Sequence, residues 1–93
     1  MQVKVKMEKN TKTGGVCATF NMNEKWYYAD LSRTFDQGNE CMIFPCENEK
    51  GEGVDWLELY CQRGIPITSE ALTACITQFV ASETNEPFQL VLE

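Results

Sequence analysis

The chain has 93 residues, of which 43% are apolar and 24% are charged, and its formal net charge is −6. This length fits one domain spanning residues 1–93, and the composition is that of a globular protein. Histidine is absent, which excludes a Ser-His-Asp triad, a Cys-His pair and any metal site with histidine ligands.

The first part of the chain predicts a β-hairpin. Val3, Val5 and Met7 alternate with charged residues, which is the period of a strand with one solvated face. Residues 10–15 are rich in turn formers and contain two glycines, and a second alternating run follows at residues 16–22.

A third strand is predicted at residues 25–31, after a turn at Asn23 and Glu24. Its three consecutive aromatic residues must point to both faces of a sheet. Residues 32–39 are polar and are predicted to form a loop.

A second hairpin is predicted further along the chain. Residues 40–46 form a strand that ends or lies at a sheet edge at Pro45, because proline cannot donate to a ladder. Residues 47–53 form a charged turn, and residues 55–61 form the returning strand. Three residues of this strand share the face that we expect to meet the helix: Leu57, Leu59 and Cys61.

Residues 69–82 predict a helix, with Thr68 as its N-cap. Apolar residues at a spacing of three and four form one stripe along it: Leu72, Cys75, Ile76, Phe79 and Val80. Residues 88–92 predict a final strand. We expect it to be paired, either beside a strand of the first hairpin or with a second copy across a two-fold axis.

Strands that precede a single helix indicate an α+β domain. The prediction is therefore an antiparallel sheet of about five to six strands, with one helix at about residues 69–82 packed on one face.

Charge is distributed unevenly along the chain. Residues 1–12 carry four lysines and one glutamate, whereas residues 36–58 carry seven acidic residues and only Lys50. Such an acidic segment repels phosphate and favours basic partners, so direct binding to DNA or RNA is not expected. Solubility is the simpler explanation of the acid excess.

Five cysteines, without a CxxC motif, indicate reduced thiols instead of a disulfide framework or a zinc site. No apolar run approaches the length of a membrane span, and the N-terminal residues lack the apolar core of a signal peptide. We expect a cytoplasmic protein without cofactor or metal and without membrane contact.

Aromatic and acidic residues give the candidate binding surface. Trp26 and Tyr28 either pack under the helix, which is the favoured interpretation, or form a partner-binding face. Trp56 and Tyr60 are expected on the open face of the sheet beside Glu58. The tentative binding residues are Trp26, Tyr28, Trp56, Glu58, Tyr60, Glu47, Glu49, Glu52 and Asp55.

Residues 40–63 read ECMIFPCENEKGEGVDWLELYCQR. This apolar strand, acidic turn and Asp-Trp-Leu-Glu-Leu run resemble short uncharacterised proteins carried by phages and integrative elements of Gram-positive bacteria. The resemblance covers about a quarter of the chain and implies no activity. It implies an accessory role in mobile DNA.

Motifs for nucleotide binding and for nucleophilic catalysis are missing from the sequence, so we do not expect an enzyme. The leading hypothesis is a small non-enzymatic cytosolic protein that acts through protein–protein contacts and can form a homodimer. The alternative is an acidic inhibitor that mimics nucleic acid and occupies the basic groove of a nuclease or DNA-binding protein.

Overall fold

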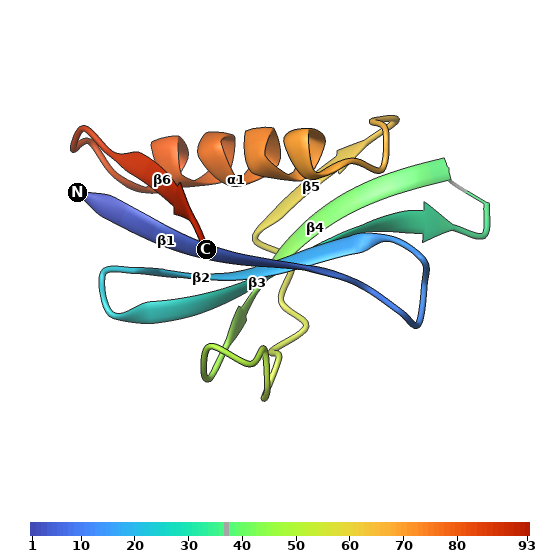
Figure 1. The fold of residues 1–93 in the computed structure, drawn as a ribbon, viewed down its shortest axis with the longest axis horizontal. Helices are drawn as coiled ribbons and strands as arrows, with labels where there is room; N and C mark the ends of the chain where they lie inside the picture. Colours follow the sequence, from blue (N-terminus) through green and yellow to red (C-terminus); the bar gives the residue numbers. More distant parts are fainter. Residues whose placement is uncertain (37) are drawn as a thin grey trace.

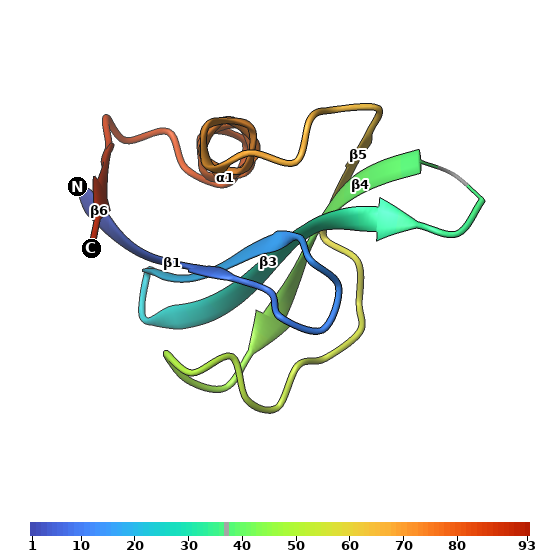
Figure 2. The same ribbon diagram turned by 45° about the vertical axis from the view of Figure 1, so that its right-hand side comes forward.

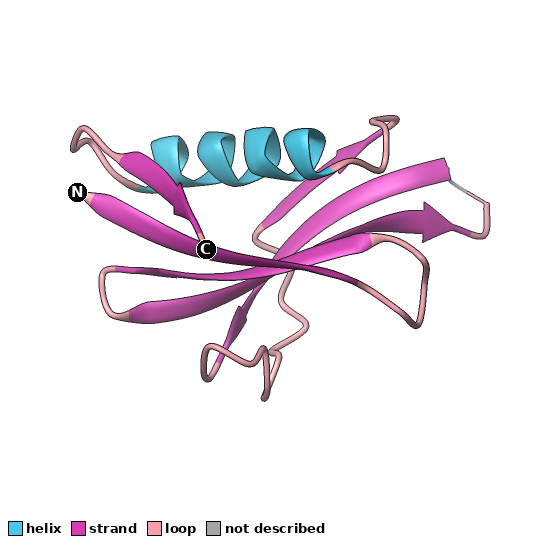
Figure 3. Ribbon diagram, viewed as in Figure 1, coloured by secondary structure: helices cyan, strands magenta, loops and turns pink. Residues whose placement is uncertain are grey.

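The computed structural model describes residues 1–36 and 38–93, which fold into a sheet with one helix on one face (Figure 1, Figure 3). Each predicted strand region contributes to the sheet, and the α+β fold class is confirmed. The elements are β1 (Gln2–Lys9), β2 (Val16–Met22), β3 (Lys25–Thr34), β4 (Gly38–Cys46), β5 (Tyr60–Arg63), α1 (Ser69–Glu83) and β6 (Gln89–Leu92).

The six strands lie in the order β5-β4-β3-β2-β1-β6. Neighbouring strands are antiparallel except for the pair of β1 and β6, which is parallel. The sheet is therefore mixed, and α1 connects strands on its two opposite edges. Pairing of β6 beside β1 is one of the two arrangements predicted for the final strand, and association with a second copy stays a prediction.

The hairpin turns follow from local sequence. Asn23 and Glu24 form a two-residue turn between Met22 and Lys25, and both have positive φ, 53° and 66°. A turn of this kind matches the twist of the flanking strands, and asparagine tolerates it better than glutamate does.

The loop between β3 and β4 is much shorter than the predicted one at residues 32–39. Residues 32–34 continue β3 and residues 38–39 begin β4, whereas residue 37 lies outside the described residues. The prediction failed because the residues added to the two strands are polar on both faces, such as Ser32 on one face and Arg33 and Asn39 on the other, and polarity alone does not distinguish a strand from a loop.

Helix α1 buries its predicted stripe against the sheet. Leu72, Cys75, Ile76, Phe79 and Val80 are each at most 1% exposed. Thr68 caps the helix as predicted, since its Oγ1 accepts a hydrogen bond from Ala71 N at 3.1 Å. Seen end-on, the helix lies over the concave face of the sheet (Figure 2). Within the described part of the chain, the helix is not long and apolar enough to cross a membrane.

Candidate functional site

The second face of the sheet, opposite α1, is only partly covered. In both views the chain between β4 and β5 descends on this side, away from the helix (Figure 1, Figure 2). We call this side the open face. The side chains that reach it decide what the protein can bind.

The three aromatic residues of β3 are divided between the two faces in the opposite way to the favoured prediction. Tyr27 points to the helix, where its ring stacks on Phe20 with centroids 5.2 Å apart and meets Phe79 edge-on at 5.3 Å. Trp26 and Tyr28 therefore lie on the open face. In a strand, the side chains of neighbouring residues point to opposite faces of the sheet, but this alternation does not determine which of them faces the core.

The predicted strand at residues 55–61 is wrong over residues 55–59, because only Tyr60 and the residues after it join the sheet. Leu59 N still donates to Ile43 O at 2.9 Å, but Pro45 has no N–H with which to extend the ladder. Leu57 and Leu59 are consequently 59% and 38% exposed instead of packed under the helix.

Tyr60 faces α1, which corrects its expected place on the open face. Its ring lies 6.5 Å from that of Phe79, and its hydroxyl donates to Gln78 Oε1 at 2.6 Å. Cys61, which was expected to face the helix, is exposed instead. The pairing of β5 with β4 decides the faces: Tyr60 lies opposite the buried Ile43 and Cys61 lies opposite Met42, whereas alternation alone does not say which set faces the helix.

A groove of about 500 Å³ crosses the open face over β3 and β4. Its floor consists of residues that are paired across the two strands: Tyr28 with Phe44, Asp30 with Met42, and Ser32 with Glu40. Directly opposed side chains lie about 5 Å apart at Cβ, so these residues form one continuous surface.

Trp56 forms one wall of the groove. Its ring meets that of Phe44 edge-on, with centroids 5.1 Å apart, yet 73% of the residue is exposed. A large aromatic residue that packs against another ring and is mostly exposed is typical of a binding surface.

The turn between β1 and β2 forms the other wall, where Asn10, Lys12 and Thr13 line the groove. Asn10 Nδ2 donates to Asp30 Oδ1 at 2.8 Å, which ties the turn to the floor. Gly15 permits this close approach, because a Cβ there would lie 2.2 Å from Leu31 O.

Two carboxylates lie in the floor with different partners. Asp30 is half-buried and accepts hydrogen bonds from Asn10 and from Ser32 Oγ, the latter at 2.7 Å to Oδ2. Glu40 is 5% exposed and pairs with Arg63, whose Nε lies 2.6 Å from Oε2. Glu40 is therefore paired with a cation, whereas the donors to Asp30 within residues 1–36 and 38–93 are uncharged.

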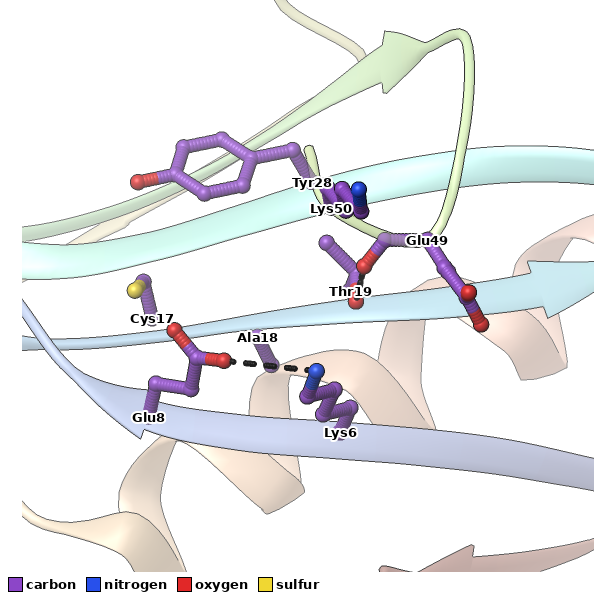
Figure 4. Close-up of a pocket in the computed structure, with 8 residues that line it drawn as sticks. All are labelled: Lys6, Glu8, Cys17, Ala18, Thr19, Tyr28, Glu49 and Lys50. Carbon is purple, nitrogen blue, oxygen red and sulfur yellow. Dashed lines mark hydrogen bonds and ion pairs between the residues drawn. The ribbon is translucent and has the colours of Figure 1, made fainter. Parts of the chain in front are cut away.

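The acidic turn at residues 47–53 folds back over β2 and β3 (Figure 4). Thr19 Oγ1 donates to Glu49 O at 2.7 Å, and Gly51 lies so close to Tyr28 that a Cβ would meet its ring at 3.1 Å. Asn48 closes the turn by accepting from Lys50 N at 2.9 Å. This loop covers one end of the open face and leaves the groove accessible.

Lysines gather where the loop meets β1 and β2. A hollow of about 340 Å³ continues from the groove, sharing Tyr28 and Trp56 with it, and its lining includes Lys9, Lys12, Lys50 and Glu8. Burial, followed by the neighbouring Cys17 and Asp30, raises the pKa of the Tyr28 hydroxyl, so this hydroxyl remains a neutral hydrogen-bonding group.

The predicted binding residues are thus only partly brought together. Tyr28 and Trp56 line the groove, Trp26 lies on the open face at the opposite end beside Glu49, and Tyr60 is on the other face. The remaining acidic residues are exposed on the chain between β4 and β5: Glu47, Glu49, Glu52, Asp55 and Glu58.

Sequence reasoning missed the groove residues Asp30, Ser32, Met42 and Phe44. Met42 and Phe44 belong to an apolar run from residue 41 to residue 44. Because the side chains on both faces of this strand are apolar, the run indicates that both faces are partly covered. Asp30 and Ser32 gave no comparable signal.

Across residues 1–36 and 38–93, no three potential metal-ligating side chains form a cluster. Comparisons with protein-family models, with curated proteins and with solved structures found no match. The geometry of the groove is consequently the basis for the functional proposal.

Proposed function

We propose that this chain is a small non-enzymatic binding protein, and that the groove on the open face receives a segment of a protein partner. The observation that carries the proposal is Trp56, which stands 73% exposed against Phe44 at the wall of the groove. Aromatic side chains in such positions supply much of the energy of protein–protein contacts.

The shape and chemistry of the groove support a peptide segment as the occupant. Its volume of about 500 Å³ accommodates a few side chains, and its lining combines apolar groups with a small number of polar ones. Met42 and Phe44 offer apolar contact in the floor, while Asp30 and Thr13 offer hydrogen-bonding groups beside them.

The alternative of a nucleic-acid mimic has less support. A mimic needs carboxylates spaced like phosphates along one surface. The acidic residues between β4 and β5 instead follow an irregular loop that also contains Lys50, and Glu40 is buried against Arg63. A cytoplasmic location and an accessory role in mobile DNA stay predictions from the sequence.

A random peptide library displayed on yeast tests the proposal. Peptides enriched on the wild-type protein should shift the NMR amide signals of Tyr28, Met42, Phe44 and Trp56. They should not bind Met42→Arg, which places a long charged side chain in the floor. Thr77→Arg, an exposed change on α1, is the matched control and should leave binding intact.

Thermal melts of Met42→Arg and Thr77→Arg are recorded first, to check that both variants are folded before their peptide binding is compared. Peptides that bind Met42→Arg as well as they bind wild type, or that shift only the signals of α1, would contradict a role for the groove. Failure to enrich any peptide would contradict the proposal as a whole.

A further inference from the structure

The carboxylate of Asp30 has unused hydrogen-bonding capacity at the centre of the groove. Oδ1 accepts from Asn10 and Oδ2 accepts from Ser32, so each oxygen is held in place and retains a second acceptor site. Ion pairs in the described part of the chain join Lys6 to Glu8 and Arg63 to Glu40, and none involves Asp30.

Aromatic rings lie beside Asp30 in the same surface of the groove. Tyr28 lies two residues before Asp30 on the same face of β3, and Phe44 lies opposite Tyr28 on β4. Trp56 extends this aromatic surface beyond Phe44. A planar cation that bonds to a carboxylate can also stack on such rings.

The charges around the groove favour a cation at Asp30 and disfavour a cation in the adjoining hollow that lysines line. Asp55 and Glu58 are exposed on the segment that carries Trp56, and Lys12 is the opposing basic group on the far wall. Beyond Tyr28 the hollow is lined by Lys9, Lys12 and Lys50 against Glu8, which repels a second cation.

We propose that the partner segment is anchored by an arginine side chain, whose guanidinium binds both oxygens of Asp30 and stacks against Tyr28 or Trp56. This inference rests on the proposed function and names the residue that the groove selects. Arginine fits better than lysine because its planar fork matches a carboxylate with two free acceptor sites, whereas an ammonium is a compact and strongly hydrated charge.

The test uses four blocked peptides of glycine and leucine that differ at one central residue: arginine, citrulline, norleucine or glutamate. Citrulline keeps the shape of arginine and removes its charge. Binding is followed by the fluorescence of Trp56 in a Trp26→Phe background, which leaves one tryptophan in the chain. We expect the arginine peptide to bind about tenfold more tightly than the citrulline peptide, the ratio typical of one charge-assisted hydrogen-bonded pair.

Asp30→Asn should abolish this preference while leaving the norleucine peptide unaffected. Glu83→Gln, which makes the same change in net charge at the far end of α1, should preserve it. A preference that survives in Asp30→Asn would overturn the inference, because general attraction to an acidic protein would then explain it.

The other outcomes are equally decisive. Equal binding of the arginine and citrulline peptides overturns the arginine anchor but leaves the groove as a peptide site. Tightest binding of the glutamate peptide overturns it in favour of the lysine-lined end. If none of the four peptides binds, the inference fails, and the library selection then decides separately whether the groove binds any peptide.

Discussion

Phe79 is the side chain on which the contact between helix and sheet depends. It is 1% exposed, and its ring meets those of Phe20, Tyr27 and Tyr60 at centroid distances of 6.0, 5.3 and 6.5 Å. Replacement by alanine removes these ring contacts and leaves a cavity, which costs about 3–5 kcal/mol. Because a chain of 93 residues has a stability of roughly 5–14 kcal/mol, Phe79→Ala should remove a large fraction of it.

Urea denaturation followed by far-ultraviolet circular dichroism measures this loss. The same change should lower the Tm by roughly 12–40 °C, at about 4–8 °C per kcal/mol for a domain of this size. Thr77→Ala, on the exposed side of the same helix, is the control and should change stability by less than about 0.5 kcal/mol. A loss below about 2 kcal/mol for Phe79→Ala would refute the reasoning, because the ring could not then be a central contact of the core.

The remaining predictions concern stability and thiol chemistry. Ile76→Asp should unfold the domain, because an unpaired carboxylate at a fully buried position costs several kcal/mol; a cooperative melt close to that of wild type would contradict this. Glu24→Gly should raise the free energy of unfolding by about 0.5–1 kcal/mol, since Glu24 has a φ of 66°, and an unchanged urea midpoint would count against strain there. Deletion of residues 87–93 should lower the Tm sharply by exposing the edge of β1, and an unchanged melt would mean that β6 contributes nothing. In native protein, Cys61 should react with a thiol reagent before Cys41, which is fully buried, and equal rates would contradict the described packing. Burial and then Cys75 raise the pKa of Cys41, so the unfolded thiol ionises first and stability should fall as the pH rises above about 8.5; Cys41→Ala should flatten this decline in pH-dependent melts.

The sequence predicted the structure best where a single local pattern determines the type of element and its buried face. The helix was predicted to within one residue because Thr68 supplies a cap and the apolar stripe has the helical period. The first hairpin was predicted for a similar reason, since Val3 and Val5 have charged neighbours and only one of their faces can be buried.

The predictions failed where two faces of a strand had similar chemistry. Trp26, Tyr27 and Tyr28 are all aromatic, so the choice of face depended on Phe20 and Phe79, which are distant in sequence. The same difficulty hid the groove, because its floor needs the register between β3 and β4, which no local pattern contains. A binding surface assembled from several strands is for this reason harder to predict than a helix.

The pairing of β6 with β1 determines when the sheet can be completed. Gln89 N donates to Met1 O at 3.0 Å, so the two strands that pair are separated by almost the whole chain. Residues 89–92 are synthesised after the other strands and the helix, so the edge of β1 stays unpaired until β6 has been made. Contacts of such long range close late and slow folding, and the open edge can meanwhile pair with another nascent chain. Strand β6 therefore completes the sheet last, and any change that weakens its pairing with β1 should increase aggregation during folding.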